Sequence, residues 1–198
     1  VTSSFGTVQL RSVSNVTLDG SDGDRTLTVA TPVGTSLTTT LTPGASDDSG
    51  ELQVGSLLAM NFANLGVNGA ITLSDPDAIA DDNFVYQGTS ANDTFTVTGG
   101  AVLNLGSRIP VNASGAIDLL TLNGGDGDDS FTITAGHGIA AIDVAGGNVS
   151  AADRVTLNGD AGGTNAEVNL GTATPSVSGA GLGTINLTGM ELATVNNG

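Results

Sequence analysis

The sequence predicts an all-β fold, and more specifically a parallel β-solenoid (β-helix) with coils of about 35 residues. Three observations predict it: a composition poor in helix formers, a short motif that recurs at nearly constant spacing, and a strand pattern that keeps its phase between recurrences. An antiparallel β-sandwich is the alternative fold, because Asn-Gly and Asp-Gly pairs are also strong signals for hairpin turns.

The composition favours strands and turns over helices. The chain contains 30 Gly, and 17 of its 20 acidic residues are Asp, while all four cationic residues are Arg. Gly, Asp, Asn, Ser and Thr favour turns, caps and strands over helix interiors. With 38% hydrophobic residues but only five Phe, one Tyr and no Trp, the core must consist mainly of aliphatic side chains. A positive mean hydropathy (+0.17) and only 12% charged residues argue against disorder.

The recurring motif is an apolar-Thr-apolar triplet followed by an amide or acid and then Gly. Its marker glycines are separated by 35, 33, 36, 35 and 39 residues. A nearly constant spacing is the signature of stacked structural repeats. The marker glycines are residues 20, 55, 88, 124, 159 and 198.

The residues between markers predict three short strands in each coil, separated by Gly, Asp and Asn turns. The first strand ends at the marker, a second lies seven to nine residues after it, and a third follows about fifteen residues after it. The position seven residues after the marker is apolar throughout and predicts an internal column with a spacing of about 4.8 Å. For residues 56–65 the spacing of apolar residues does not decide between a short helix and a strand. The column contains Leu27, Phe62, Phe95, Phe131 and Ala166.

A longer period is also present. Phe5-Gly-Thr-Val-Gln-Leu10 matches Leu182-Gly-Thr-Ile-Asn-Leu187 at an offset of 177 residues, close to five coils. We therefore expect residues 1–198 to form one elongated repeat domain that is one unit of a longer tandem array.

Net charge and cysteine content exclude several function classes. The formal net charge is −16 and the pI is about 4.1, which argues against nucleic-acid and anionic-lipid partners. No apolar run is long enough for a transmembrane helix, and the first residues indicate a mature or internal start. The absence of Cys excludes disulfides and thiolate chemistry. The acidic, Lys-free composition favours an extracellular or cell-surface location.

One loop has a specific motif. Gly124-Gly-Asp-Gly-Asp-Asp-Ser-Phe-Thr132 fits the nonapeptide G-G-x-G-x-D-x-U-x and resembles the haemolysin-type (RTX) calcium-binding repeat. Residues 20–28 and 88–96 are imperfect relatives, the first with Arg25 in place of the ligand Asp. The resemblance implies Ca²⁺, a hard cation that binds oxygen ligands. The ligands that it implies are Asp126, Asp128 and Asp129, with Asp22, Asp24, Asn92 and Asp93 in the imperfect copies.

The three segments depart from the family because they are not arranged head to tail, so the shared ion site does not transfer directly. The alternation of Asp/Gly blocks with Thr/Val strands, ending in Met190–Gly198, also looks like the tandem arrays of large bacterial surface proteins. That resemblance implies a non-enzymatic structural or adhesive role. The implied partners are neighbouring identical repeats or subunits, with carbohydrate or a cell surface as further candidates. A self-assembling filament or surface-layer subunit is the alternative.

A second set of acids recurs six or seven residues before each marker after the first. Stacked carboxylates about 5 Å apart repel by about 3 kcal/mol at an effective dielectric constant of 20, and a cation would relieve this repulsion. The other interpretation is that they cap turn amides at the strand starts. Asp75, Asp77 and Asp81 form a looser acidic loop that we expect to be solvated. The set consists of Asp48, Asp82, Asp118, Asp153 and Glu191.

Little in the sequence predicts catalysis. His137 is the only histidine, and its Gly-flanked setting predicts an exposed turn residue. With 17 Asp in the chain, no single carboxylate pair is informative. Arg108 and Arg154 are the basic candidates for a β-helical carbohydrate-active enzyme, which is the less favoured function. We therefore predict no catalytic residues.

Overall fold

The computed structural model describes residues 16–31, 33–74, 82–113, 115, 117–148, 152–162, 165–171 and 173–196. Every regular element within these residues is a β-strand, which confirms the predicted all-β class. The strands are β1 (Val16–Asp19), β2 (Thr26–Ala30), β3 (Thr38–Pro43), β4 (Gly50–Val54), β5 (Met60–Ala63), β6 (Ala70–Ser74), β7 (Asn83–Gln87), β8 (Thr94–Thr98), β9 (Val102–Leu105), β10 (Val111–Asn112), β11 (Leu119–Asp126), β12 (Ser130–Thr134), β13 (Ala141–Asn148), β14 (Arg154–Asn158), β15 (Glu167–Asn169), β16 (Ser176–Ser178), β17 (Thr184–Thr188) and β18 (Leu192–Asn196).

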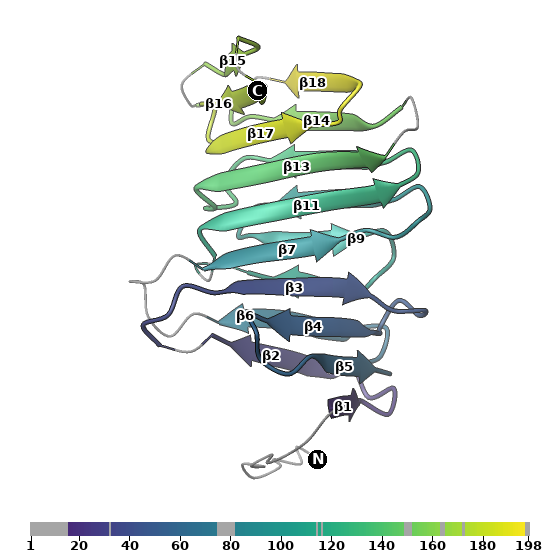
Figure 1. Ribbon diagram of the computed structural model, residues 1–198. Coiled ribbons are helices and arrows are strands. Elements are labelled where there is room, and N and C mark those ends of the chain that lie inside the picture. Colours follow the sequence, from purple (N-terminus) through teal and green to yellow (C-terminus); the bar gives the residue numbers. More distant parts are fainter. Residues whose placement is uncertain are drawn as a thin grey trace.

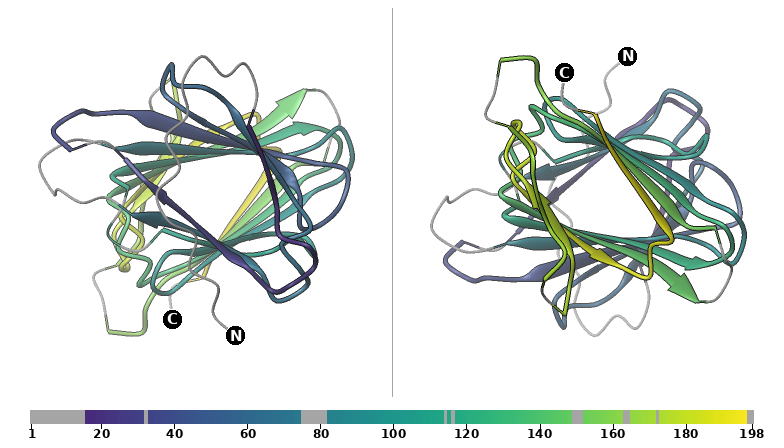
Figure 2. Two further views of the ribbon diagram at one scale, coloured as in Figure 1. Left: turned by 90° about the horizontal axis from the view of Figure 1, so that it is seen from below. Right: turned by 90° about the horizontal axis from the view of Figure 1, so that it is seen from above.

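The strands form two open, mixed sheets. The ten-stranded sheet has the order β1-β5-β4-β3-β7-β11-β13-β17-β16-β15, and the eight-stranded sheet has the order β18-β14-β12-β8-β9-β10-β6-β2. In Figure 1 the strands lie one above another, from β1 near one end to the β15–β18 region at the other. Figure 2, viewed along this stack, shows the two sheets facing each other across a common interior.

The parallel pairings show how far the predicted spacing holds. Leu119 on β11 pairs with Asn83 on β7, an offset of 36 residues, but also with Ala141 on β13, an offset of only 22. In the other sheet, β12 is offset by 36 residues from β8 and by 24 from β14. The predicted spacing of about 35 residues is therefore present between β7 and β11 and between β8 and β12. The next coil, from β11 to β13 and from β12 to β14, is shorter because it contains only one strand in each sheet.

Antiparallel strands inserted between successive parallel strands lengthen the other offsets, to 45 residues between β3 and β7 and 43 between β13 and β17. Among the described strands, ten of sixteen pairings are parallel and six are antiparallel. The antiparallel pairs join β3–β4–β5, β8–β9–β10 and β15–β16–β17. The predicted hairpin signals at Gly20, Gly124 and Gly159 are not hairpin turns, because the chain there passes from one sheet to the other.

The core lies between the facing sheets. Alternate residues of each strand point inward, as Leu120 and Leu122 do on β11 and Phe131 and Ile133 do on β12. The rings of Phe95 and Phe131 stack with centroids 5.1 Å apart and planes tilted by 7°, which confirms the predicted aromatic column at these two positions. Burial of these apolar side chains provides the main force that holds the sheets together.

The column prediction is wrong at Phe62. This residue lies on β5 in the ten-stranded sheet, whereas Phe95 lies on β8 in the eight-stranded sheet. The antiparallel β3–β4–β5 insertion shifts the phase of the chain, so equal spacing in sequence does not give equal position. The aromatic neighbour of Phe95 across the core is Tyr86, at 5.6 Å and 87°. Residues 56–65, which left helix and strand open, contain strand β5.

Two sets of predictions lie outside the described residues. They are the hexapeptide Phe5–Leu10 and the acidic loop of Asp75, Asp77 and Asp81.

Candidate functional site

A row of four carboxylates crosses the eight-stranded sheet at the end where its parallel strands β8, β12, β14 and β18 begin. Each stands immediately before one of these strands, and we call the row the carboxylate ladder. It consists of Asp93, Asp129, Asp153 and Glu191. The backbone N–H of Asp93 donates to Oδ1 of Asp129 at 2.8 Å, and the N–H of Asp129 donates to Oδ1 of Asp153 at 2.6 Å. The N–H of Asp153 donates to Oε2 of Glu191 at 2.8 Å. The side chains of Asp129, Asp153 and Glu191 therefore each cap the amide that precedes the neighbouring strand.

The ladder continues the backbone hydrogen bonding of the sheet. The N–H of Ser130 donates to the carbonyl of Asp93, and the N–H of Arg154 donates to that of Asp129. A backbone amide bonded to a carboxylate is a charge-assisted hydrogen bond, stronger than a neutral one. The strand starts are thus held in register by both main chain and side chains.

The first carboxylate of the ladder also closes its own turn. Oδ2 of Asp93 accepts the N–H of Thr89 at 2.5 Å and its hydroxyl at 3.0 Å. This is the local capping that Asp commonly provides in turns. Asp93 thus caps its own turn, whereas Asp153 and Glu191, for which capping was one of the two interpretations, cap the amide before a neighbouring strand.

Glycines make room for the ladder. A Cβ atom on Gly124 would overlap with Oδ2 of Asp129 and with the carbonyl oxygen of Gly146. A Cβ on Gly146 would likewise overlap with Oδ2 of Asp153, and one on Gly88 would lie 2.7 Å from Oδ2 of Asp93. The glycines of the nonapeptide-like segments thus serve close packing between backbone and carboxylate.

Asp129 is the most constrained member of the ladder. It is fully buried, and its Oδ2 has no hydrogen-bond partner. Burial raises the pKa of the Asp129 carboxyl to about 6. The nearby charges of Asp153, Asp93 and Asp128 also raise it, and the hydrogen bond from the Asp93 amide lowers it.

Two of the three nonapeptide-like segments lie directly on each other. The register pairs Phe95 with Phe131, and the N–H of Asp128 donates to Oδ1 of Asn92 at 2.9 Å. The structure therefore brings together Asn92, Asp93, Asp128 and Asp129, although 36 residues separate the two pairs. The two segments belong to separate coils of the sequence pattern, and the stacking of Phe95 on Phe131 brings them into contact.

The outer rim of the same region carries exposed polar groups. Asp126 is exposed at the end of β11 and lines a shallow hollow with Thr89, Ser90, Asn123 and neighbouring glycines. Within the described ranges, no three His, Cys, Asp or Glu side chains gather closely enough to hold a metal ion. Calcium binding stays a prediction, and Asp126 and Asp128 are the implied ligands that lie nearest this rim.

The remaining implied ligands lie elsewhere. Asp22 and Asp24 are exposed in the turn between β1 and β2 and have positive φ angles of 53° and 49°. Both carboxylate oxygens of Asp24 accept hydrogen bonds from Asn68, which lowers the pKa of Asp24. The structure does not bring Asp22 and Asp24 together with Asp126, Asp128 and Asp129, because β2 and β12 lie far apart in the strand order.

The second acidic set does not form a single column. Asp82 and Asp118 precede β7 and β11, where the N–H of Asp82 donates to Oδ2 of Asp118 at 3.0 Å. Asp153 and Glu191 belong to the carboxylate ladder on the other sheet. Asp48 instead bonds Ser46 and the amide of Gly66. The set divides because the strand that reaches the marker glycine lies on the ten-stranded sheet at Gly88 and Gly124 but on the eight-stranded sheet at Gly159.

The prediction for His137 is wrong: the residue is only 3% exposed. Its Nδ1 accepts the N–H of Ile139, and its Nε2 bonds the carbonyl of Leu182, both at 3.1 Å. These partners assign the neutral tautomer with the proton on Nε2. Burial lowers the pKa of His137. The ring therefore ties the 135–139 turn to the segment before β17.

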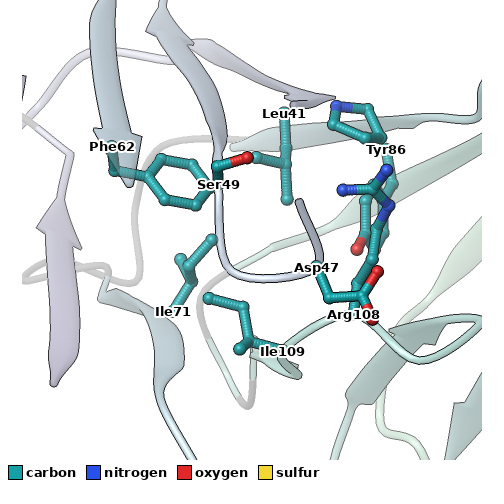
Figure 3. A pocket seen from close by; sticks show the side chains of 9 residues that line it. Leu41, Asp47, Ser49, Phe62, Ile71, Tyr86, Arg108 and Ile109 are labelled. Atoms are coloured by element: carbon teal, nitrogen blue, oxygen red, sulfur yellow. The ribbon is translucent and has the colours of Figure 1, made fainter. Parts of the chain in front are cut away.

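Arg108 has a structural role that joins two loops. Its guanidinium donates to the carbonyls of Ser46 and Gly44, each at 2.9 Å. Figure 3 shows Arg108 beside a small cavity that Leu41, Phe62 and Ile71 also line. The cavity measures about 10 Å³, which is room for about one water molecule.

The sequence contained a signal for the ladder that spacing from the marker glycines obscured. An acid stands immediately before the inward-facing strand in Asp93-Thr-Phe, Asp129-Ser-Phe and Asp153-Arg-Val. Aligning the chain on the strand starts, rather than on the glycines, would have placed Asp93, Asp129 and Asp153 in one set, although Asp82-Asn-Phe and Asp118-Leu-Leu share the same pattern.

Comparison with known protein families, with curated proteins and with solved structures found no match. Within the part of the chain that the structure describes, no helix has the length and apolar character needed to cross a membrane.

Proposed function

We propose that the chain is a β-solenoid segment that serves as a non-enzymatic structural module of a bacterial surface protein. The observation that carries this proposal is the run of parallel strands from β3 to β17 in the ten-stranded sheet and from β8 to β18 in the eight-stranded sheet, the latter reinforced at its strand starts by the carboxylate ladder. Solenoids of this kind extend by adding strands at their ends, so stability grows with length and the exposed sides remain available for contacts.

The packing supports a structural role over a hollow binding protein. The core is filled by aliphatic and aromatic side chains from both sheets. The sole histidine and Arg108 are engaged in contacts that hold loops in place. Two of the three residues considered for catalysis, His137 and Arg108, thus have structural partners.

An extracellular location and calcium stabilisation belong to the same proposal. The supporting features are the net charge of −16, the absence of Cys, and the exposed acidic rim around Asp126. A dication at this rim would reduce the repulsion within an acidic chain and bind oxygen ligands that it prefers.

Immunolabelling tests the proposal. Antibodies against this chain should label intact, unpermeabilised cells of the producing organism, and the recognised polypeptide should be much longer than 198 residues. Antibodies against a cytosolic protein serve as the permeability control. Labelling only after permeabilisation would overturn the surface role.

The purified chain should also release no reducing or unsaturated ends from neutral and acidic polysaccharides, and turnover that His137→Ala or Arg154→Ala abolishes would overturn the non-enzymatic assignment.

A further inference from the structure

The first and last strands of the structure share one sequence pattern, an apolar-Thr-apolar triplet followed by an acid or amide. The offset of 177 residues that relates Phe5–Leu10 to Leu182–Leu187 continues without a gap to residues 16–19 and 193–196. Val16-Thr-Leu-Asp19 forms β1, and Ala193-Thr-Val-Asn196 lies on β18. The match thus links a strand at one end of the molecule with a strand at the other.

The two strands also have complementary open edges. Among the described strands, β1 is the last of the ten-stranded sheet and pairs with β5 alone, while β18 is the last of the eight-stranded sheet and pairs with β14 alone. Both pairings are parallel. If one strand occupied both positions, β14 would lie on one side of it and β5 of a following copy on the other.

From these observations we propose that a second copy of this sequence follows in the same polypeptide, with β18 of one copy serving as β1 of the next. The structural period is then 177 residues. Because β1 and β18 belong to different sheets, the ten-stranded sheet of each copy continues the eight-stranded sheet of the copy before it. This inference rests on the proposed structural role.

Side chains on the shared strand fit both neighbours. Nδ2 of Asn196 donates to Oδ1 of Asn158 at 2.8 Å, and Oδ1 of Asp19 accepts from Nδ2 of Asn64 at 3.2 Å. Asn196 is the equivalent of Asp19, and an amide side chain can donate through Nδ2 while it accepts through Oδ1. Asn196 therefore bonds Asn158 on one side and is placed to bond Asn64 of the next copy on the other.

The backbone pattern is the same on both sides. The N–H of Gly159 donates to the carbonyl of Asn196, and the N–H of Gly20 donates to the carbonyl of Ala63. The same bond recurs within the stack, from Gly88 to Asn123. In the single chain, however, the apolar side chain of β1 is not buried as its counterparts within the stack are. Leu18 on β1 is 38% exposed, whereas Leu157 on β14 is fully buried.

A joined protein tests this proposal. Residues 1–196 are fused directly to residues 20–198 of a second copy, so that one strand serves both. We expect a single cooperative unfolding transition and at least tenfold slower amide exchange in residues 192–196, and in residues 60–63 of the second copy, than in the single chain. The control joins two complete copies through a flexible Gly/Ser linker, which should melt like the single chain.

Independent melting of the two halves, with unchanged exchange at the junction, would overturn the proposal. A single-chain variant provides a second test if the fusion does not fold. The double variant Ala193→Val/Val195→Leu, which gives β18 the apolar side chains of β1, should leave the melting temperature and the exchange of β14 unchanged. Loss of protection in β14 would contradict the equivalence of the strands. Cell-surface labelling is a separate measurement, so failure of the surface role would not be confused with failure of this junction.

Discussion

Phe95 and Phe131 stack face to face inside the core, one directly above the other on neighbouring parallel strands. The stack is offset by 36 residues in sequence and links two steps of the eight-stranded sheet. Because Phe131 is fully buried, its ring contributes both to apolar burial and to the register of β12.

Phe131→Ala should therefore lower the free energy of unfolding by about 3 to 5 kcal/mol, through lost burial and the cavity that remains. Urea denaturation followed by circular dichroism measures this change. Phe131→Leu is the matched control and should cost less than half as much. An alanine variant as stable as the parent would contradict the stacked core.

The raised pKa of the Asp129 carboxyl should make the folded protein less stable as the pH rises. Its carboxyl has a pKa of about 6 when folded and about 3.8 when unfolded. Below about pH 4 both states are protonated and the full stability is present. Between pH 4 and 6 the unfolded state ionises first, so this contribution is lost, by on the order of 2 to 3 kcal/mol at pH 7.

Asp129→Asn should remove this loss, because an amide keeps the acceptor for the Asp93 N–H without a buried charge. We expect the variant to be more stable than the parent at pH 7 and nearly equal to it at pH 4. Unfolding curves at the two pH values measure the difference, with the exposed Asp126→Asn as control. Equal stabilities of variant and parent at both pH values would show that Asp129 ionises normally.

The lowered pKa of His137 should make the folded protein less stable as the pH falls, opposite to the effect of Asp129. Burial lowers its folded pKa below 6.5, so the unfolded state takes up a proton first as the pH falls. Stability should decrease below about pH 6.5 until the folded pKa is reached. The difference between parent and His137→Gln, followed from pH 8 to 5, isolates this contribution. A difference that does not vary with pH would place a charged imidazole in the folded protein.

Calcium should raise the melting temperature if the acidic rim binds it. Millimolar Ca²⁺ over a site with a Kd of about 10 μM adds about 2.7 kcal/mol, which corresponds to roughly 5 to 10 °C. Mg²⁺ should have little effect, because it requires stricter octahedral geometry. A chelator should reverse the shift.

The ligands are tested by two double variants that remove equal charge. Asp126→Asn/Asp128→Asn should lose most of the response, whereas Asp160→Asn/Glu167→Gln, at other exposed positions, should keep it. The variant Asp128→Asn/Asp129→Asn should lose it as well. A melting temperature indifferent to Ca²⁺ would mean that the nonapeptide-like loop is a turn that only accommodates the carboxylate ladder.

The strand content and the Phe95–Phe131 contact were predictable because both follow from local alternation of apolar and polar residues. The assignment of Phe62 was not, since an antiparallel insertion changes the sheet on which the motif falls without changing its spacing. Such insertions depend on long-range pairing, which no short pattern encodes.

The same limit applies to the candidate site. The sequence indicated that Asp93 and Asp129 matter, through the nonapeptide pattern, but not that the Asp129 carboxylate bonds the Asp93 amide or that the Asp153 carboxylate bonds the Asp129 amide. His137 was expected in solvent because its flanking glycines indicate a turn. The turn exists, but the segment before β17 covers it.

The unequal offsets between parallel strands also determine how the molecule would respond to a mechanical load. Tension applied between the β1 end and the β18 end acts along the inter-strand hydrogen bonds, so strands should peel off one after another rather than slide together. A step of 22 residues releases about 75 Å of chain and one of 45 residues about 150 Å, because an extended residue spans about 3.4 Å. The protein would lengthen in unequal increments, with the shortest from the region where β11 and β13 lie side by side.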